Sequence, residues 1–278
     1  MPSDENIIWL NGRLRPAVEA GVFPLDRGFT LGDGVFETLR AYGGIPFAST
    51  RHWQRLAQAC ETTGLPVPTC DEFTHVLSAT LAANDLLEAR VRFTVTRGSD
   101  PEGHSPTVVC SATPAITFAA TERVATAPWT RNENGALAGV KSLSYAENVM
   151  AIAHAKRESA GEALFFNTRG ELCEGATTNI FIVKDTNVFT PPLSSGCLAG
   201  VTRELVIELC RDHQISISEI PLSSRELMDA DEAFLTSSTR AVQPISHING
   251  IPFSSCSSPI GERIGGLFRS ILHQNYTL

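Results

Sequence analysis

The chain has very few lysines. Only three of its 22 basic residues are lysines, Lys141, Lys156 and Lys184, and the other nineteen are arginines. A reaction that needs a side-chain amine therefore has three residues to choose from. Cysteine is also sparse: the chain has seven, an odd number, and no C-x-x-C pair. This pattern argues against a disulfide framework and against a zinc site, so we expect reduced thiols and a cytoplasmic protein.

The sequence also lacks a run of about 18 uncharged apolar residues, the length that a membrane-spanning helix needs. Residues 1–6 are polar and acidic, which is not the pattern of a secretory signal. Acidic residues outnumber basic ones by 30 to 22, and the net charge of −8 argues against nucleic acid as a partner. Apolar residues make up 42% of the chain, enough for one large folded domain or two modest ones.

Predicted strands and helices alternate along the chain without repeats, which indicates an α/β or α+β protein. On the strand predicted over 34–42, Phe36, Thr38 and Arg40 share one face, and Glu37 lies on the other. On the strand predicted over 90–97, Arg90 and Arg92 share a face. Further strands are expected over 7–10, 108–119, 163–167, 178–183 and 232–237, and helices over 51–63, 71–84, 145–159, from 202 onward and near 224–228.

The periodic pattern fades around residues 121–132, where proline and asparagine mark a connection. We therefore expect an N-terminal α/β domain over 1–120, a linker over 121–132 and a C-terminal α/β domain over 133–278. Lys141 would belong to the C-terminal domain.

Lys141 differs from the other two lysines in its surroundings. Lys184 lies in a predicted hairpin turn and Lys156 among charged residues of a helix, whereas Lys141 lies in a weakly polar stretch. An amine in such surroundings loses part of its proton affinity and can form imines. Taken alone, a surface lysine is the commoner interpretation, because buried lysines are rare.

Three further polar segments give Lys141 a chemical context. Glu174 precedes a glycine, two threonines and an asparagine that run into an apolar strand; residues 196–203 form a glycine-containing bend that opens a helix; and residues 236–239 end another strand. Each alone has an ordinary interpretation as a turn or a helix cap. Together, an amine, a carboxylate and groups that bind an anion suit an aldehyde cofactor with a phosphate and a ring nitrogen, namely pyridoxal phosphate.

In this order, the segments resemble the fold-type IV pyridoxal-phosphate enzymes. This class IV aminotransferase family holds branched-chain aminotransferases, D-amino acid aminotransferases and aminodeoxychorismate lyases. The resemblance covers about residues 8–253, and its motifs include GDGVFET at 32–38, RHxxRL at 51–56, KSLSY at 141–145, EGATTNIF at 174–181 and LxGVTR at 198–203. It implies a fold of two α/β domains with pyridoxal 5'-phosphate between them, and a homodimer in which loops of the partner chain close the site.

The resemblance also implies roles for individual residues. Lys141 would carry the Schiff base and then act as the general base at the substrate Cα. Glu174 would pair with the pyridinium nitrogen, and Thr38 is a third catalytic candidate. The residues implied to bind the cofactor are Arg55, Lys141, Tyr145, Glu174, Thr177, Thr178, Asn179, Leu198, Gly200, Val201, Thr202, Ser237 and Ser238. Among them, Arg55, the Val201 N–H, Thr202 and the Ser237–Ser238 pair would hold the phosphate.

The family's members differ at positions that this sequence only partly matches. Leu31 and Thr38 stand where branched-chain enzymes usually have tyrosine and glycine, which disfavours a branched-chain L-amino acid aminotransferase. D-amino acid enzymes bind the substrate carboxylate with an Arg-x-His motif; here His104 matches the histidine, but Glu102 replaces the arginine. Thr38 matches the lyases, yet their Gly-x-Arg-Gly-Tyr loop is absent.

The resulting hypothesis is a transaminase that moves an amino group between an amino acid and a 2-oxo acid, with D-amino acids and (R)-amines among the candidate substrates. The alternative is aminodeoxychorismate lyase, which eliminates pyruvate; a relative that does not catalyse a reaction is a third interpretation, disfavoured by the intact Lys141 and Glu174. The hand and side chain of the substrate, and the arginine that binds its carboxylate, stay open. The substrate-binding candidates are Phe29, Leu31, Phe36, Arg40, Arg90, Arg92 and His104.

Overall fold

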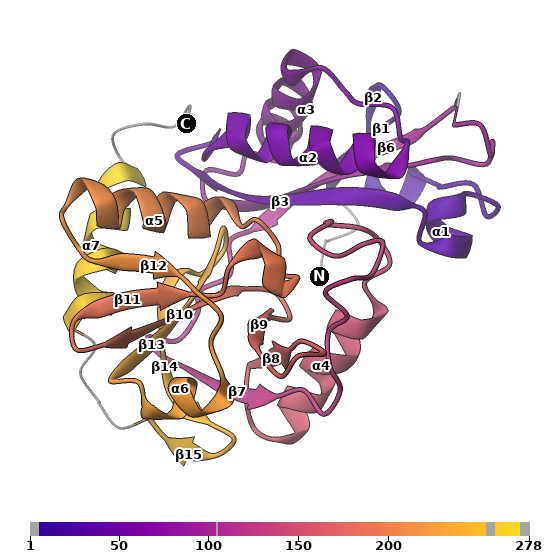
Figure 1. The fold of residues 1–278 in the computed structure, drawn as a ribbon. Coiled ribbons are helices and arrows are strands. Elements are labelled where there is room, and N and C mark those ends of the chain that lie inside the picture. Colours follow the sequence, from indigo (N-terminus) through magenta and orange to yellow (C-terminus); the bar gives the residue numbers. More distant parts are fainter. Residues whose placement is uncertain (1–5, 104, 254–258, 273–278) are drawn as a thin grey trace. The chain divides into compact units, whose positions relative to one another are not determined.

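The computed structural model describes residues 6–103, 105–253 and 259–272 (Figure 1). The chain forms two compact units. The first comprises the described residues up to Thr117 together with Val140–Tyr145, and the second comprises Phe118–Gly139 and the described residues from Ala146 to Ile271. Two consecutive α/β units agree with the expected fold class.

The boundaries differ from those expected from the sequence. Strand β7 (Glu122–Thr126) lies within the segment expected to be a linker, and it pairs with strands of the second unit. Lys141 belongs to the first unit, although we expected it in the C-terminal domain.

The first unit is built on an antiparallel sheet of six strands in the order β2-β1-β6-β5-β3-β4. Helices α2 and α3 cover one face of this sheet (Figure 1). The strands are β1 (Ile7–Leu10), β2 (Arg13–Pro16), β3 (Gly34–Tyr42), β4 (Ile45–Pro46), β5 (Ala89–Thr96) and β6 (Thr107–Pro114). The helices are the short η1 (Ala17–Glu19), α1 (Arg27–Leu31), α2 (Ser49–Thr63) and α3 (Cys70–Ala83).

Strand β3 has two chemically different faces because side chains alternate along it. Val35, Leu39 and Ala41 are fully buried against α2 and α3, where they join Leu56 and Phe73 in the hydrophobic core. The opposite face carries Phe36, Thr38 and Arg40, as the sequence predicts.

The segment Val140–Tyr145 belongs to the first unit because it completes an open strand edge. Strand β4 pairs only with Ala41 and Tyr42, at the far end of β3. At the near end, the Phe36 N–H donates to the Lys141 carbonyl at 3.0 Å, and the Leu143 N–H donates to the Gly34 carbonyl at 2.8 Å. These two bonds fix the backbone of Lys141 against β3.

The second unit is built on a mixed sheet in the order β12-β11-β10-β13-β14-β7-β8-β9, with β15 paired to β14. The pairs β11–β12, β14–β7 and β7–β8 are parallel. Besides β7, the strands are β8 (Glu162–Phe166), β9 (Leu172–Gly175), β10 (Asn179–Lys184), β11 (Asn187–Thr190), β12 (Ile217–Glu219), β13 (Glu232–Ser237), β14 (Ala241–Ile248) and β15 (Ile251–Pro252). The helices are α4 (Ala146–Arg157), η2 (Leu193–Ser195), α5 (Val201–Asp212), α6 (Ser224–Asp229) and α7 (Pro259–Leu272).

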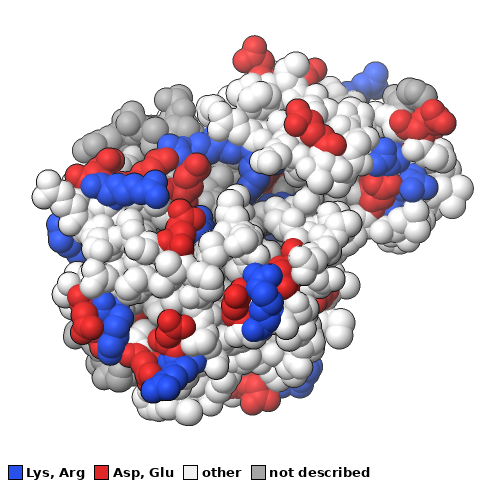
Figure 2. Space-filling model, in the orientation of Figure 1, with Lys and Arg blue, Asp and Glu red and all other residues white. Residues whose placement is uncertain are grey.

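Packing in the second unit follows the amphipathic character of its helices. Helix α4 places Ala151 and Ala155 against Phe165 of β8, while Leu227 of α6 packs against the apolar residues of β10 and β13. On the face shown in Figure 2, acidic and basic side chains are interspersed rather than separated by sign. No helix in the described part of the chain is both long enough and apolar enough to cross a membrane.

Candidate functional site

Lys141 lies beside two aromatic rings of the first unit. Its Nζ is 4.4 Å from the centroid of the Phe36 ring and 5.8 Å from that of Tyr145. The two rings meet edge to face, with their centroids 5.3 Å apart. Lys156 is exposed, and Lys184 forms an ion pair with Asp231 at 3.0 Å. Lys141 is therefore the lysine whose amine lies beside two aromatic rings and whose backbone is fixed by β3.

Arg92 lies on the same side of the sheet as Phe36. Its Cζ is 3.7 Å from the centroid of the Phe36 ring, and Arg92 faces Thr38 in the register of β3 and β5. Within the described residues its guanidinium makes no hydrogen bond and no ion pair. Burial, and then the charge of Arg90, lower the pKa of Arg92 to about 10. The structure thus places an unpaired, half-buried cation close to Lys141.

Arg40 has a different environment from Arg92, although the sequence places both among the substrate candidates. Its Nη2 donates to Glu88 at 3.0 Å, and its guanidinium lies 5.2 Å from the Tyr42 ring centroid. An arginine whose charge is already paired is a weaker candidate for a substrate carboxylate than Arg92 is.

A buried ion cluster lies on the opposite face of β3. The Glu37 carboxylate accepts from Arg55 Nε at 2.8 Å and Nη2 at 2.7 Å, and lies 2.7 Å from His52 Nδ1. Burial alone raises the pKa of Glu37, but the charge of Arg55 and the hydrogen bonds from Arg55 and His52 outweigh it and hold the pKa well below its usual value. Burial lowers the pKa of His52, which keeps its imidazole neutral.

Glu174, on β9, is a buried carboxylate of the second unit. Its Oε2 accepts from the Leu198 N–H at 2.9 Å, and its Oε1 lies 3.9 Å from Arg131 Nη1. The Asn179 side chain donates to the Leu198 carbonyl at 2.9 Å. The segment before α5 is thereby joined to β9 on one side and to β10 on the other.

The start of α5 lies close to the end of β13. The Gly200 N-cap has no side-chain cap, and a Cβ at Gly200 would collide with Asn179 Oδ1. Asn179 pairs with Thr236 in the sheet, and Ser237 and Ser238 follow. Val201 and Thr202, the first residues of the helix, are both buried. A helix whose N-cap residue has no side chain presents N–H donors of a kind that suits an anion.

The turn between Glu174 and β10 is held by a second buried carboxylate, Glu162. Its oxygens accept from the N–H groups of Ala176 and Thr177 and from the Thr177 hydroxyl. Burial raises the pKa of Glu162 despite these bonds. The neighbouring Thr178 hydroxyl is buried and makes no hydrogen bond within the described residues.

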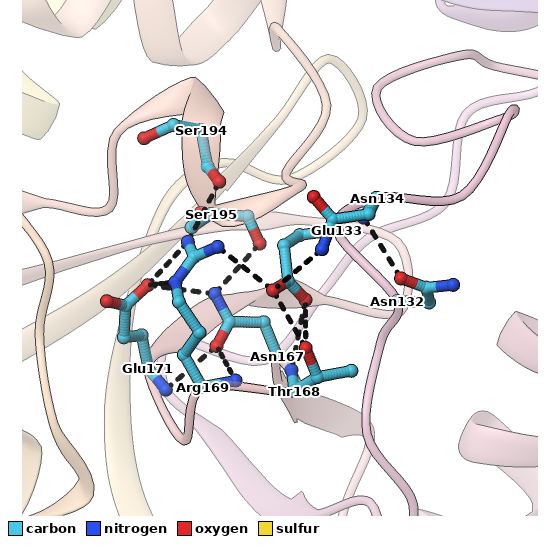
Figure 3. A network of polar contacts seen from close by, with 9 residues as sticks. All are labelled: Asn132, Glu133, Asn134, Asn167, Thr168, Arg169, Glu171, Ser194 and Ser195. Carbon is cyan, nitrogen blue, oxygen red and sulfur yellow. Dashed lines mark hydrogen bonds and ion pairs between the residues drawn. The ribbon is translucent and has the colours of Figure 1, made fainter.

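A polar network holds residues 132–134, which precede Lys141 in sequence, to the turn after β8 (Figure 3). Glu133 accepts from the Thr168 hydroxyl at 2.8 Å and from Arg169 Nη1 at 2.9 Å, and Arg169 also donates to Glu171 at 2.7 Å. Asn167 donates to the Ser195 carbonyl at 3.3 Å. All of these groups belong to the second unit, so the segment that continues to Lys141 starts from a fixed point.

Of the predicted substrate residues, two are exposed on α1 and one lies outside the described residues. Phe29 and Leu31 belong to α1 and are 78% and 62% exposed. They therefore line no buried pocket within the described chain. His104 lies outside the described residues.

Sequence reasoning missed four charged residues of these clusters: Glu37, His52, Glu162 and Arg131. His52 and Arg55 are three apart on a predicted helix, so they share a face that could meet the strand carrying Glu37. A carboxylate among apolar core positions of β3 was the available signal. Arg131, whose Cζ is 4.2 Å from the Phe165 ring centroid, lies in the segment expected to be a linker and gave no such signal.

The first unit contains a lysine amine beside aromatic rings, and the second contains a buried carboxylate and a helix that starts at a glycine. Groups of these kinds suit pyridoxal phosphate. Comparison with known proteins gives the family. The model of the family described as amino-transferase class IV matches residues 34–248, so the chain belongs to the class IV aminotransferases, which use pyridoxal phosphate as cofactor.

Three comparisons cover most of the chain. A provisionally named branched-chain-amino-acid aminotransferase of Methanocaldococcus jannaschii is 35% identical over 87% of this chain and 88% of its own. D-alanine aminotransferase of Bacillus licheniformis is 31% identical over 87% of this chain and 88% of its own. The crystal structure of the branched-chain aminotransferase of Thermoproteus uzoniensis with norvaline superposes with a TM-score of 0.91 at 30% identity, over 97% of this chain and 96% of that one.

Proposed function

We propose that the protein is a transaminase that moves the amino group of an aliphatic α-amino acid to a 2-oxo acid. The observation that carries the proposal is Arg92, a half-buried guanidinium that has no acidic partner among the described residues and contacts the same Phe36 ring as the Lys141 amine. An α-amino acid carries its carboxylate one bond from the carbon that reacts. A cation close to the lysine therefore suits its carboxylate.

The residues of each unit fit the cofactor of the family. In the first unit, Lys141 supplies the amine, and Tyr145 lies beside it. In the second unit, Glu174 supplies a fixed carboxylate for the ring nitrogen, and the N–H groups at the start of α5 supply donors for the phosphate. Thr177, Thr178, Asn179, Leu198, Ser237 and Ser238 surround these groups in the chain and are proposed to complete the cofactor site.

Bound pyridoxal phosphate supplies a carbonyl for the substrate's amino group and a ring that withdraws electrons from the Cα. The Lys141 amine would take the proton from the substrate Cα and return it on the cofactor side. Glu174 would keep the ring nitrogen protonated, and Arg92, with Arg90 nearby on the same face of β5, would orient the substrate carboxylate.

Two of the relatives support an aliphatic substrate. The protein of Bacillus licheniformis is named for D-alanine and that of Methanocaldococcus jannaschii for branched-chain amino acids, and both substrates have uncharged aliphatic side chains. From Leu31 and Thr38 we expected branched-chain substrates to be disfavoured, but a branched-chain name occurs among the most similar relatives. L-Leucine therefore stands beside D-alanine in the proposal.

The single-turnover half-reaction tests this function. The purified holoenzyme is mixed with D-alanine, L-leucine or L-norvaline without a 2-oxo acid. We expect at least one of them to remove the visible absorption of the bound cofactor and to yield pyridoxamine phosphate and the matching 2-oxo acid. Lys141→Ala should show neither change. If no amino acid alters the wild-type spectrum, the transaminase proposal is wrong.

Aminodeoxychorismate lyase stays as the second candidate because of Thr38. Thr38 lies on the same face of β3 as Phe36 and opposite Arg92 in the sheet, the position where the lyases carry a threonine. Release of pyruvate from aminodeoxychorismate, with no spectral response to amino acids, would favour this reaction.

We also propose that the enzyme is a homodimer that uses the apolar side chains exposed around α1. Phe29 and Leu31 would then contribute to the site of the partner subunit, which would account for their exposure in a single chain.

A further inference from the structure

Glu37 occupies a position where an apolar residue would be expected. It lies on the face of β3 that points to α2, between the core residues Val35 and Leu39, and it is 0% exposed. A buried carboxylate has a large desolvation cost, and apolar residues of similar volume often stabilise a core as well or better. Stability alone therefore does not account for a charge at this place.

The contacts of Glu37 determine the orientation of one side chain, Arg55. Both carboxylate oxygens accept from it, Oε1 from Nε at 2.8 Å and Oε2 from Nη2 at 2.7 Å. A planar guanidinium held along one edge by two parallel bonds cannot rotate, and its opposite nitrogen, Nη1, points away from the carboxylate. The Arg55 side chain is 14% exposed, while Glu37 lies beneath it.

His52 completes the arrangement without adding charge. Its pKa is lowered by burial, so the neutral ring donates from Nδ1 to the ionised Glu37 at 2.7 Å. His52 and Arg55 are three residues apart on α2, which brings both to the same carboxylate. One negative and one positive charge face each other, and Glu37 is saturated by donors from α2.

We propose that Glu37 is a positioning residue that holds the Arg55 guanidinium in the orientation needed to bind the phosphate of the cofactor. The inference rests on the proposed function, in which Arg55 binds that phosphate. Glu37 lies on the far side of β3 from Phe36 and Lys141 and acts only through Arg55. Its loss should weaken the binding of a ligand that carries the phosphate and spare a ligand that lacks it.

The experiment compares two ligands on the full-length apoprotein. Dissociation constants of pyridoxal 5'-phosphate and of pyridoxal, which lacks the phosphate, are measured by absorption titration. We expect Glu37→Gln to raise the dissociation constant of pyridoxal phosphate at least about tenfold, which is roughly 1.4 kcal/mol, and that of pyridoxal less than about twofold. General destabilisation would weaken both ligands alike.

A double-mutant cycle tests whether Glu37 acts through Arg55. Arg55→Met should reduce the preference for the phosphate, and Glu37→Gln should have no further effect in the Arg55→Met background. Asp33→Asn is the matched control. Asp33 also accepts from two arginines of the first unit, Arg27 and Arg97, each at 2.9 Å, so its loss should leave the preference for the phosphate unchanged.

The outcomes separate this inference from the proposed function. If Arg55→Met loses the preference and Glu37→Gln retains it, the positioning role is wrong and the cofactor assignment of Arg55 stands. If neither variant changes the preference, both assignments fall, while the transaminase half-reaction is judged by its own test. Should Glu37→Gln fail to fold by circular dichroism, Glu37→Asp replaces it. That variant keeps the charge one methylene further back, and it should weaken pyridoxal phosphate alone.

Discussion

Burying an arginine that has no acidic partner among the described residues lowers the stability of a folded unit. Arg92 has lost much of its hydration, and its pKa is lowered to about 10 by burial and by Arg90. The lowered pKa means that burial and Arg90 destabilise the charged form in the free protein, and the contact with the Phe36 ring offsets part of this cost. A site that awaits an anion has this property, because the counterion arrives with the substrate.

Arg92→Met should therefore weaken substrate binding and stabilise the free enzyme. We expect the KM of the amino acid substrate to rise about tenfold or more, and the melting temperature of the free enzyme to rise by about 2 °C or more. Steady-state kinetics and calorimetry measure the two effects. Arg40→Met is the control: its loss breaks the contact with Glu88 and should leave KM unchanged. An unchanged KM in Arg92→Met would remove this residue from the substrate site.

The contributions of Glu37 and His52 to the free energy of unfolding depend on pH. Both have pKa values lower in the folded protein than their ordinary values of 4.5 and 6.5. The stability that each group contributes is thus fully present at a pH above its ordinary pKa. It is lost as the pH falls toward the lowered pKa of the folded protein, because the unfolded chain takes up protons that the folded one does not. For Glu37 the loss begins near pH 4.5.

Urea unfolding at several pH values tests this prediction. The difference in free energy of unfolding between the wild type and Glu37→Gln should be largest near pH 7 and should shrink as the pH falls below about 4.5. A difference that stays constant down to pH 3.5 would mean that folding does not lower the pKa of Glu37.

At the scale of elements, the edge of β3 decides where Lys141 lies. Gly34 begins this strand, and a Cβ there would lie 2.6 Å from the Val95 carbonyl oxygen and 2.6 Å from a methyl group of Leu143. The Val95 carbonyl cannot move without disturbing the pairing of β3 with β5, and the Leu143 side chain, in the segment that carries Lys141, would have to change its conformation. The absence of a side chain at Gly34 is therefore a condition for the position of Lys141.

Gly34→Ala should lower both stability and activity. We expect a loss of about 1–3 kcal/mol in the free energy of unfolding, typical of overpacking, together with a lower kcat because the backbone of Lys141 shifts. Gly21→Ala, whose added Cβ meets nothing within 4 Å, is the control. Equal kcat values for the two variants would contradict the link between this strand edge and the lysine.

The elements differ in how far the sequence predicts them. Local periodicity predicts β3, β5, α2 and α3 to within a few residues, and it places Phe36 and Glu37 on opposite faces of β3. It does not predict β7 as a strand, because this short segment becomes one through pairing with β14 and β8, which are distant in sequence. The docking of Lys141 on β3 is likewise a pairing across about a hundred residues, which no local pattern encodes.

The residues of the candidate site also differ in how far the sequence predicts them. Lys141 and Glu174 stand out in the sequence because of their chemical type and their motif. The hydrogen-bond partners of Glu37 and Glu162 cannot be recognised in this way, because a buried carboxylate accepts from whichever donors the fold brings to it. The role of His52 follows only from its three-dimensional contacts.

At the scale of the whole molecule, the segment around α1 combines rigid anchoring with exposed apolar side chains. Asp26 is buried and accepts from the Gly28 N–H at 2.7 Å and from the hydroxyls of Thr96 at 2.9 Å and Thr107 at 2.6 Å. Yet Phe29 and Leu31, a few residues on, are largely exposed. A firmly held helix that presents aromatic and aliphatic groups to water is typical of a surface that another chain covers.

The proposed dimer makes this surface testable. Phe29→Asp places a charge where the partner chain would pack, so we expect the variant to sediment as a monomer at concentrations where the wild type is a dimer, and its activity to fall with the dimer fraction. Leu87→Asp is the control, since Leu87 is also a largely exposed leucine of the first unit but lies outside the α1 segment. It should leave the mass unchanged. If the wild type is a monomer and fully active, Phe29 and Leu31 have no role in a partner's site. If Phe29→Asp stays dimeric, Phe29 does not hold the dimer together.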